Sequence, residues 1–249
     1  MFAIYKKELR SYFINAIGYV YVGVFLAAAA LLCCYTTLGS QSYDTSTYFT
    51  MLIFAFIILI PLLTMKLFAE EKKLRTEQLL LTAPVSIWEM VLGKFLAAFT
   101  LFFGTVVVSC INFFPLYSYA RAERANESYS VMHVGPVTAE ILSCLIGIIL
   151  IGAAFIAIGL FVSSLTENQL AAAVGTIAII LLLLAVGLIG LFLPTTYWLR
   201  FVFDAVSIFT RFQNFTAGYF DIASVVYYLS VSAVFLYLTV RVYDRRRYN

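Results

Sequence analysis

The chain has 249 residues, of which 63% are hydrophobic and 12% charged, whereas ordinary soluble domains carry about 25% charged residues. This composition excludes a soluble globular domain, because a soluble core could not cover so much apolar sequence. The formal net charge is +3, and the distribution of the charges along the chain is more informative than their sum.

Six apolar stretches are each long enough to cross a bilayer, which takes roughly 20 predominantly apolar residues. They run continuously instead of alternating with polar residues, and this excludes barrel strands. Backbone groups in lipid must then be satisfied within helices. We therefore expect an all-α polytopic membrane protein, one membrane domain over residues 1–249. The expected spans are Ile17–Leu38, Tyr48–Met65, Phe95–Tyr119, Glu140–Val162, Leu170–Leu193 and Ile222–Val242.

Residues 1–15 precede the first span and are predicted to form an amphipathic helix that lies in the membrane interface. Their apolar residues recur at helical spacing, and their cations gather on the neighbouring face, where anionic headgroups would attract them. The alternative is a plain basic flank that only sets the orientation. The apolar stripe consists of Phe2, Tyr5, Leu9 and Tyr12, and the cations are Lys6, Lys7 and Arg10.

The segment 66–94 between the second and third spans contains the densest charged run of the chain, Lys66–Glu77. Strong helix formers dominate Lys66–Thr82, so we expect the second span to continue as a helix to about Ala83. The residue before Pro84 disfavours the α conformation, and a proline suits the first turn of a second helix. Two short helices would then meet at Pro84. A solvated charged turn is the alternative.

Two other connections face the opposite side of the membrane. Ala120–Thr138 is a short polar loop, too short for a domain. Thr195–Asp221 follows the end of the fifth span at Pro194 and mixes aromatic residues with occasional charges, as interfacial segments do. We expect it to form one or two short re-entrant helices that dip into the outer leaflet without crossing.

The basic residues are distributed unevenly between the two sides, and cytoplasmic loops carry the excess of Lys and Arg. Twelve lie on the side of the termini and four on the other, which places both termini and the 66–94 loop in the cytoplasm. The net positive charge therefore reflects the topology and does not indicate nucleic-acid binding. The twelve are Lys6, Lys7, Arg10, Lys66, Lys72, Lys73, Arg75, Lys94, Arg241, Arg245, Arg246 and Arg247; the four are Arg121, Arg124, Arg200 and Arg211.

Several chemical signatures are missing from the sequence. Gly93-Lys94 is followed by Phe95 and lacks the spacing of a phosphate-binding loop, so nucleotide would have to bind another chain. His133 is the single histidine. The four cysteines lie in apolar spans without CxxC spacing, so we expect them to be small core residues instead of ligands or disulfide partners. Ionisable residues are almost absent from the span interiors, which argues against ion-coupled transport. We expect no catalytic, cofactor-binding or metal-binding residue in this chain.

Several short motifs follow one another along the chain: Lys6–Leu9 with Ser11–Phe13, Glu70–Lys73, Thr76–Thr82, Pro84–Ser86, Gly93-Lys94, and Phe212, Gly218 and Asp221 with Tyr227–Ser230. With these motifs in this order, the chain resembles the membrane subunits of exporter-type (type 2) ABC transporters, especially the gliding-motility and nitrous-oxide-reductase-maturation branch. In two places it departs from the usual pattern: Arg75 stands where a Gly is usual, and Ala83 where a polar or basic residue is common.

The resemblance implies a permease that itself is not an enzyme, coupled to a separate cytoplasmic ATPase that binds ATP and Mg²⁺. The 66–94 loop would be the coupling helix that rests on this ATPase. Two ATPase subunits, a second permease copy or relative, membrane lipids and an accessory extracytoplasmic subunit would complete a bacterial cytoplasmic-membrane exporter. The implied ATPase contacts are Glu71, Arg75, Thr76, Glu77, Leu80 and Pro84, and Phe212, Gly218 and Asp221 mark the outer re-entrant segment.

Two other functions remain open at this point. The chain could be a passive membrane anchor or mechanical scaffold that recruits a cytoplasmic ATPase without moving a substrate. It could also be an integral-membrane enzyme acting on lipid, an alternative that rests only on the apolar interior. The apolar spans would line a pathway suited to an amphiphilic or membrane-extracted substrate, which favours export.

Overall fold

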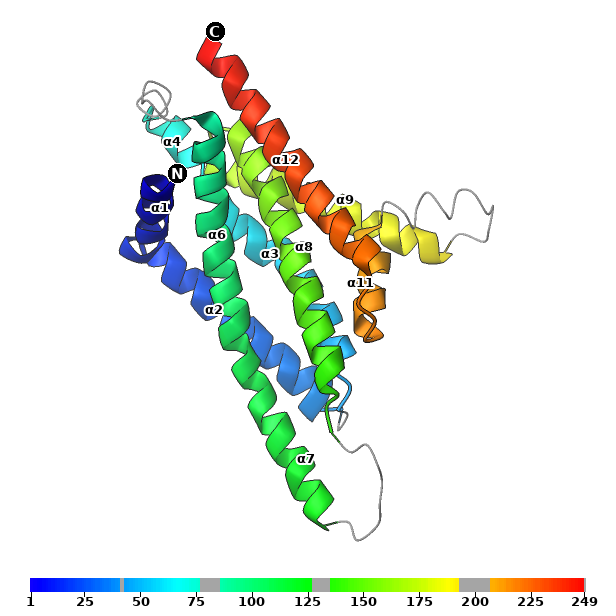
Figure 1. Ribbon diagram of the computed structural model, residues 1–249. Coiled ribbons are helices and arrows are strands. Elements are labelled where there is room, and N and C mark those ends of the chain that lie inside the picture. Colours follow the sequence, from blue (N-terminus) through cyan, green and yellow to red (C-terminus); the bar gives the residue numbers. More distant parts are fainter. Residues whose placement is uncertain (41–42, 77–85, 127–134, 193–206, 249) are drawn as a thin grey trace.

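The computed structural model describes residues 1–40, 43–76, 86–126, 135–192 and 207–248, and in these ranges it contains helices and no strand (Figure 1). The helices are α1 (Phe2–Ile14), α2 (Ala16–Cys33) with the π turn η1 (Cys34–Leu38), α3 (Ser46–Thr64), α4 (Ala69–Lys73), α6 (Ile87–Ser109) with the 3₁₀ turn η2 (Cys110–Phe113), α7 (Phe114–Asn126), α8 (Thr138–Leu165), α9 (Gln169–Phe192), α11 (Ile208–Thr216) and α12 (Ile222–Tyr248).

Six helical segments in the described ranges are long and apolar enough to cross a membrane, which confirms the all-α polytopic fold. The second and sixth segments extend beyond their expected ends, to Lys73 and Arg247, and the third starts earlier and ends later than expected. That segment runs from Ile87 to Arg121, and α7 continues it to Asn126. The loop expected from Ala120 onward therefore begins later, because helix-forming residues prolong the span beyond its apolar part.

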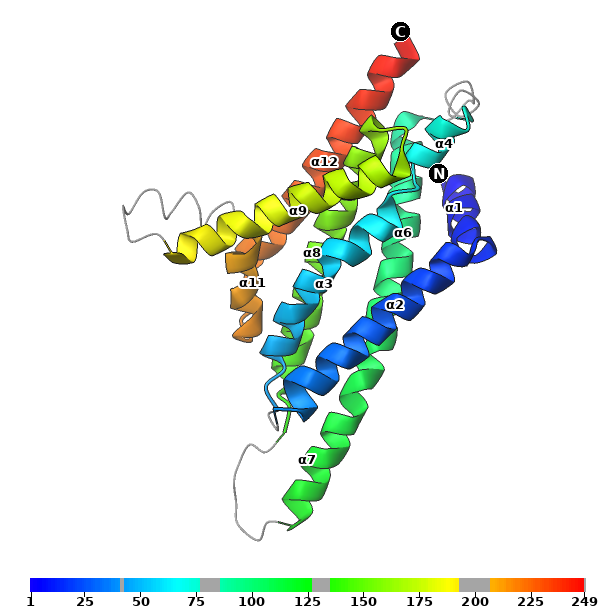
Figure 2. The ribbon, with the colours of Figure 1, turned by 180° about the vertical axis from the view of Figure 1, so that it is seen from behind.

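The helix α8 lies at the centre of the bundle, and 72% of its most apolar stretch is buried by α3, α6, α9, α11 and α12 (Figure 2). Small residues let these neighbours approach closely. A Cβ on Gly152 would lie 2.2 Å from the ring of Phe102 in α6, and one on Gly159 would lie 2.2 Å from the hydroxyl of Thr64 in α3. Close packing of small residues is a common way to join membrane helices.

Large apolar side chains are exposed along the outer helices of the bundle. Leu31 of α2 is 72% exposed, Leu182 of α9 is 64% exposed and Val226 of α12 is 56% exposed. Such continuous apolar faces are unsuited to water but match a hydrocarbon environment. The exposure pattern thus agrees with helices that border lipid or another membrane chain.

The helix α1 turns into α2 at Asn15, whose backbone is extended (ψ 142°). It lies beside α6, where the terminal amine of Met1 pairs with Glu89 (3.3 Å) and the Tyr5 hydroxyl donates to Thr100 (3.2 Å). Its buried side centres on Glu8 and Tyr12, while Phe2 is 75% exposed. The helix is therefore docked on the bundle, and its place in the lipid interface stays a prediction.

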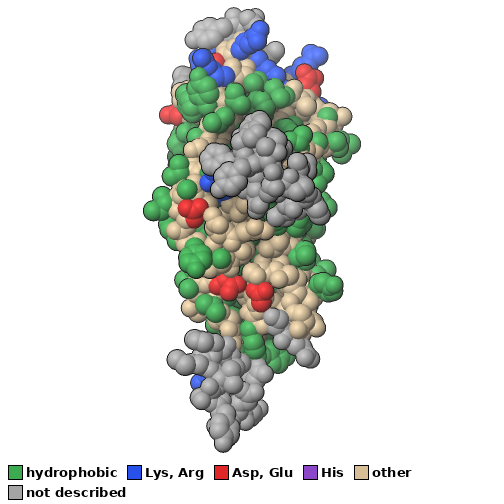
Figure 3. Space-filling model, turned by 90° about the vertical axis from the view of Figure 1, so that its right-hand side faces the viewer, with side chains coloured by type: hydrophobic (Ala, Val, Ile, Leu, Met, Phe, Trp, Pro, Cys, Tyr) green, Lys and Arg blue, Asp and Glu red, His purple; other side chains and the backbone are tan. Residues whose placement is uncertain are grey.

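The two termini, α1 and α4 share one end of the molecule (Figure 1). Figure 3 shows that the Lys and Arg side chains of the visible face gather toward that same end, while acidic side chains also occur farther down. This end is the one that the distribution of basic residues predicts to be cytoplasmic.

Candidate functional site

The connection between α3 and α6 contains the candidate site, and its described part is residues 65–76. We predicted one helix from Lys66 to Thr82, which is wrong for this part: α3 ends at Thr64, and α4 begins after a short turn. The turn forms because Phe68 inserts into the core, where it is 1% exposed and its ring lies 4.7 Å from that of Tyr243 in α12.

The hydroxyl of Ser163, at the end of α8, holds the start of α4 in place. It accepts hydrogen bonds from the backbone amides of Phe68 and Ala69, both at 3.2 Å, and donates to the carbonyl of Met65 at 3.2 Å. The first amides of a helix have no partner within the helix. A residue about 95 positions away in the chain thus supplies what a local N-cap usually supplies.

The end of α4 is set by Arg75, which has a positive φ of 57°. The amide of Thr76 donates to the carbonyl of Glu71, and that of Arg75 to the carbonyl of Lys72, both at 3.0 Å. This pair of bonds is the pattern that ends a helix in a left-handed residue, a position that glycine fills most readily. The usual Gly at this place in the resembled family therefore has a conformational reason.

Four charged side chains meet behind α4 and are referred to below as the Lys94 cluster: Lys7 and Glu8 of α1, Glu71 of α4, and Lys94 of α6. The Lys94 ammonium lies 2.9 Å from Glu71 and 3.0 Å from Glu8, and it donates to the carbonyl of Leu67 at 2.7 Å. Lys94 is fully buried. The sequence predicts Lys94 to be the last residue of the loop, and this prediction is wrong. Lys94 lies two turns inside α6, where the two carboxylates compensate its charge.

Lys7 closes the cluster from the more exposed side, with its ammonium 3.2 Å from Glu71 and 3.6 Å from Glu8. Partial burial lowers the pKa of Lys7, but the carboxylates of Glu71 and Glu8 outweigh this effect and the pKa is raised overall. Lys7 therefore stays charged well into the alkaline range, and the cluster holds two positive and two negative groups.

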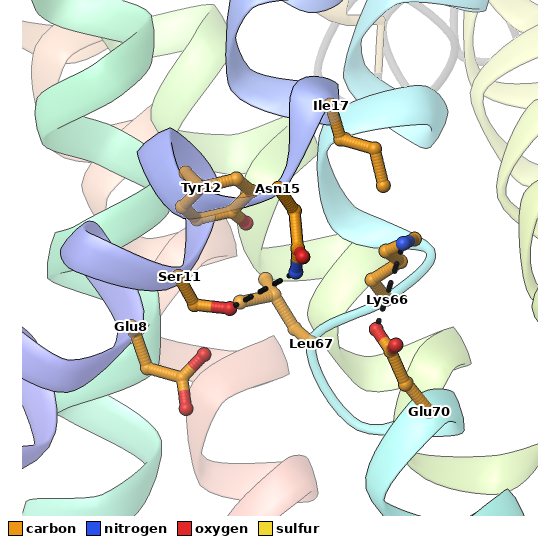
Figure 4. Close-up of a pocket in the computed structure, with 8 residues that line it drawn as sticks. All are labelled: Glu8, Ser11, Tyr12, Asn15, Ile17, Lys66, Leu67 and Glu70. Carbon is orange, nitrogen blue, oxygen red and sulfur yellow. Dashed lines mark hydrogen bonds and ion pairs between the residues drawn. The ribbon is translucent and has the colours of Figure 1, made fainter.

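A small pocket of about 40 Å³ opens beside the cluster, between α1 and the turn that precedes α4 (Figure 4). The carboxylate of Glu8, the Ser11 hydroxyl and the Asn15 amide line it from one side, and Lys66 and Glu70 form a half-buried pair at 3.8 Å on the other. It has room for water molecules, which lets water approach the outer edge of the cluster.

The last residue of α4 and the turn that follows it are exposed to solvent. Lys73, Leu74, Arg75 and Thr76 are all exposed, and Leu74 is 64% exposed. We call these four residues the α4 face. The predicted ATPase contacts Arg75 and Thr76 belong to it, whereas the carboxylate of Glu71 faces Lys94 and Lys7 inside the chain. The predicted contacts Glu77, Leu80 and Pro84 lie outside the described residues.

The helix after the loop starts at Ile87, because the side chain of Ser86 caps it by accepting a hydrogen bond from the amide of Glu89 at 3.2 Å. The second short helix that we expected up to Lys94 is therefore the beginning of the third span and is continuous with it. Trp88 projects from this turn and is 46% exposed, with its ring 6.1 Å from that of Tyr237.

The outer segment forms one short helix in its described part, α11, with a turn that leads into α12. Phe212 is fully buried against α8, and Gly218 takes a positive φ of 76° that suits glycine. Asp221 caps α12: its carboxylate accepts from the Ser224 hydroxyl at 2.6 Å and the Ala223 amide at 3.0 Å. The hydrogen bond from Ser224, with others around it, lowers the pKa of Asp221.

Neither of these regions gathers groups that could hold a metal ion, and no cluster of three or more His, Cys, Asp or Glu residues occurs in the part of the chain that the structure describes. Among the cysteines, Cys33 and Cys144 are buried, Cys110 is half-buried and Cys34 is exposed. The prediction that all four are small core residues is therefore wrong for Cys34.

The fold and the loop define a multi-pass helical membrane protein with a structured polar junction at one end. The sequence model of the family described as ABC-2 family transporter protein matches residues 11–241, so the chain belongs to that family. It is accordingly a permease subunit of an ABC transporter. Permeases of this family generally work with an ABC ATPase and are generally not catalytic themselves. A comparison with curated proteins finds no match.

Sequence reasoning missed the Lys94 cluster, although two signals pointed to it. Glu8 is the one acidic residue before Asp44, and Lys94 is the one charge in the apolar stretch from Met90 to Ala120. An isolated acid and an isolated base that flank spans on the same side of a membrane are candidates for a buried pair, because each needs a partner when it leaves water.

Proposed function

We propose that this chain is the permease subunit of an ATP-driven exporter of the gliding-motility and nitrous-oxide-reductase-maturation branch, in the cytoplasmic membrane of a bacterium. Both termini and the 66–94 loop face the cytoplasm. The permease couples ATP hydrolysis in a separate ATPase to the movement of a substrate across or out of the membrane. Two ATPase subunits, which bind ATP and Mg²⁺, and a second copy or relative of this permease complete the transporter, with an accessory extracytoplasmic subunit.

The observation that carries this proposal is the position of the α4 face. Its exposed residues project from the end of the molecule that also holds both termini and most of the basic residues. The exposed Leu74 offers apolar area, and Lys73 and Arg75 offer charges that can set register with an acidic surface. A soluble partner at this end would meet a short, ordered helix that is tied to the membrane bundle on its other side.

The direction of transport is supported by the apolar character of the helices. The exposed side chains of α2, α9 and α12 are mainly aliphatic and aromatic, so a pathway between two copies would have apolar walls. Such walls suit an amphiphilic substrate, or one extracted from the membrane, better than a small hydrophilic ion.

A photo-crosslinking experiment tests the proposed contact. A benzophenone group is attached at Thr76→Cys in the α4 face, in a chain with Cys34→Ser, and the permease is produced together with its ATPase. The matched control is Ser40→Cys, which is exposed near the far end of α2. We expect a covalent permease–ATPase product at Thr76 that is more than about tenfold stronger than at Ser40. Equal products at both positions, or none at Thr76, would contradict the proposal.

A further inference from the structure

The Lys94 cluster joins three elements that are far apart in the chain. Lys94 itself belongs to α6, and its partners come from the other two elements: Glu8 from α1, and Glu71 and the Leu67 carbonyl from α4 and the turn before it. The contacts are 2.7–3.0 Å long. One buried ammonium thus holds α1 and α4 against the same point of α6.

The contact of α1 with α6 extends beyond this cluster. A Cβ on Gly93 would lie 3.2 Å from Ile4, so the two helices approach closely next to Lys94. The Met1 amine pairs with Glu89 one turn before it, and Tyr5 bonds to Thr100 farther on. A displacement of α4 that is transmitted through the Lys94 cluster therefore acts on α1 and α6, two helices that are already packed together.

Burial makes this cluster resist separation. A charge moved out of water loses its hydration, and only close partners compensate this loss. If α4 left α6, the ammonium of Lys94 would lose Glu71 and the Leu67 carbonyl, and it would keep only Glu8 as a partner in a place that water reaches only at its edge. The pair Lys66–Glu70, 3.8 Å apart and only partly buried beside the pocket, can open at a lower cost because water replaces each partner.

We propose that Lys94 is a positioning residue that makes α1 and the first turns of α6 move together with α4. A displacement of the α4 face then reaches the start of α2, through α1, and the start of the third span, through α6, at the same time. This inference rests on the proposed function for the source of the displacement, whereas the mechanical connection is a property of this chain alone.

The connection is tested first on the permease alone in lipid nanodiscs. Spin labels are placed at Lys6→Cys in α1 and Lys73→Cys in α4, both exposed positions, after replacement of the four native cysteines. Pulsed electron-resonance spectroscopy then gives the distribution of distances between the labels. We expect a narrow distribution in the parent chain, one at least twice as wide with Lys94→Met, and no change with the control Lys66→Met. An unchanged width with Lys94→Met would overturn the proposal.

The consequence for coupling is tested on the permease–ATPase complex, with ATP hydrolysis in nanodiscs and the melting temperature as two readouts. Lys94→Met is expected to lower both. The triple variant Lys94→Met, Glu8→Gln, Glu71→Gln also removes the two carboxylates that lose the Lys94 ammonium, so we expect most of the lost melting temperature to return while the ATPase stimulation stays about tenfold low. Lys66→Met should change neither quantity.

Each outcome of this second test has a distinct meaning. Recovery of stimulation together with stability in the triple variant would show that Lys94 only stabilises the fold, and the proposal would be wrong. If the parent complex shows no stimulation at all, the proposed function fails instead, and the spin-label widths still decide whether α1 and α4 are connected through Lys94.

Discussion

The Lys94 cluster and the turn around Asp221 are both built from charged side chains, but they stabilise the molecule in different ways. In the cluster, a fully buried ammonium joins three elements across separations of up to 86 residues. At the outer turn, the half-buried Asp221 bonds through its carboxylate to groups within seven residues of it. The first arrangement fixes how elements are placed relative to one another, and the second only fixes where a helix begins.

The largest effect on stability is expected at the junction that α4 forms with α8. Ser163→Ala leaves the buried amides of Phe68 and Ala69 without their acceptor, and each unsatisfied donor costs about 1–3 kcal/mol. We expect a loss of unfolding free energy of that order, measured by unfolding in mixed detergent micelles. The matched control is Ser230→Ala on the exposed side of α12, where the hydroxyl bonds only within its own helix. An equal loss in both variants would contradict a special role for the long-range cap.

A gain in stability is expected at the end of α4. Arg75→Gly removes a side chain from a residue with φ 57°, and the left-handed conformation costs a non-glycine residue about 1 kcal/mol. Arg75→Gly should therefore stabilise the permease by up to that amount, whereas Arg75→Ala should not. The thermal melting temperature in detergent separates the two. If both variants lose stability, the side chain of Arg75 contributes more than its backbone strain costs.

The smallest effect is expected at the outer turn, and it should depend on pH. The folded-state pKa of Asp221 is lowered, so its contribution is present above the unfolded value of about 4 and is lost as the pH falls through the folded-state value. Asp221→Ala should lose a small amount of stability at neutral pH, and Asp221→Asn less, because Asn also caps helices well. Melting temperatures between pH 3 and pH 7 test this; a difference that grows as the pH falls would be the wrong sign.

The Lys94 cluster and the turn around Asp221 also differ in how far the sequence predicts them. Six spans were predictable because a run of about 20 apolar residues has few other interpretations. A short helix before Asp221, and the capping role of Asp221, follow from local residue types. These features depend on residues that are neighbours in the chain, so they can be recognised in the sequence without knowledge of the fold.

The break in the helix after Thr64 and the burial of Lys94 were not predictable in the same way. Helix propensity favours one helix through Lys66–Thr82, but the insertion of Phe68 into the core and the capping by Ser163 override it. Lys94 resembled a cytoplasmic loop residue because its compensating partners, Glu8 and Glu71, come from other elements. Tertiary contacts decided both features.

The most direct test of these contacts is a cryo-electron microscopy structure of the permease with its ATPase, determined without nucleotide and with ATP bound. We expect ATPase density against the α4 face in both states. We also expect Lys94 to stay within salt-bridge distance of Glu8 and Glu71 while α4 moves. ATPase density at the opposite end of the molecule, or a Lys94–Glu71 pair that separates on ATP binding, would contradict it.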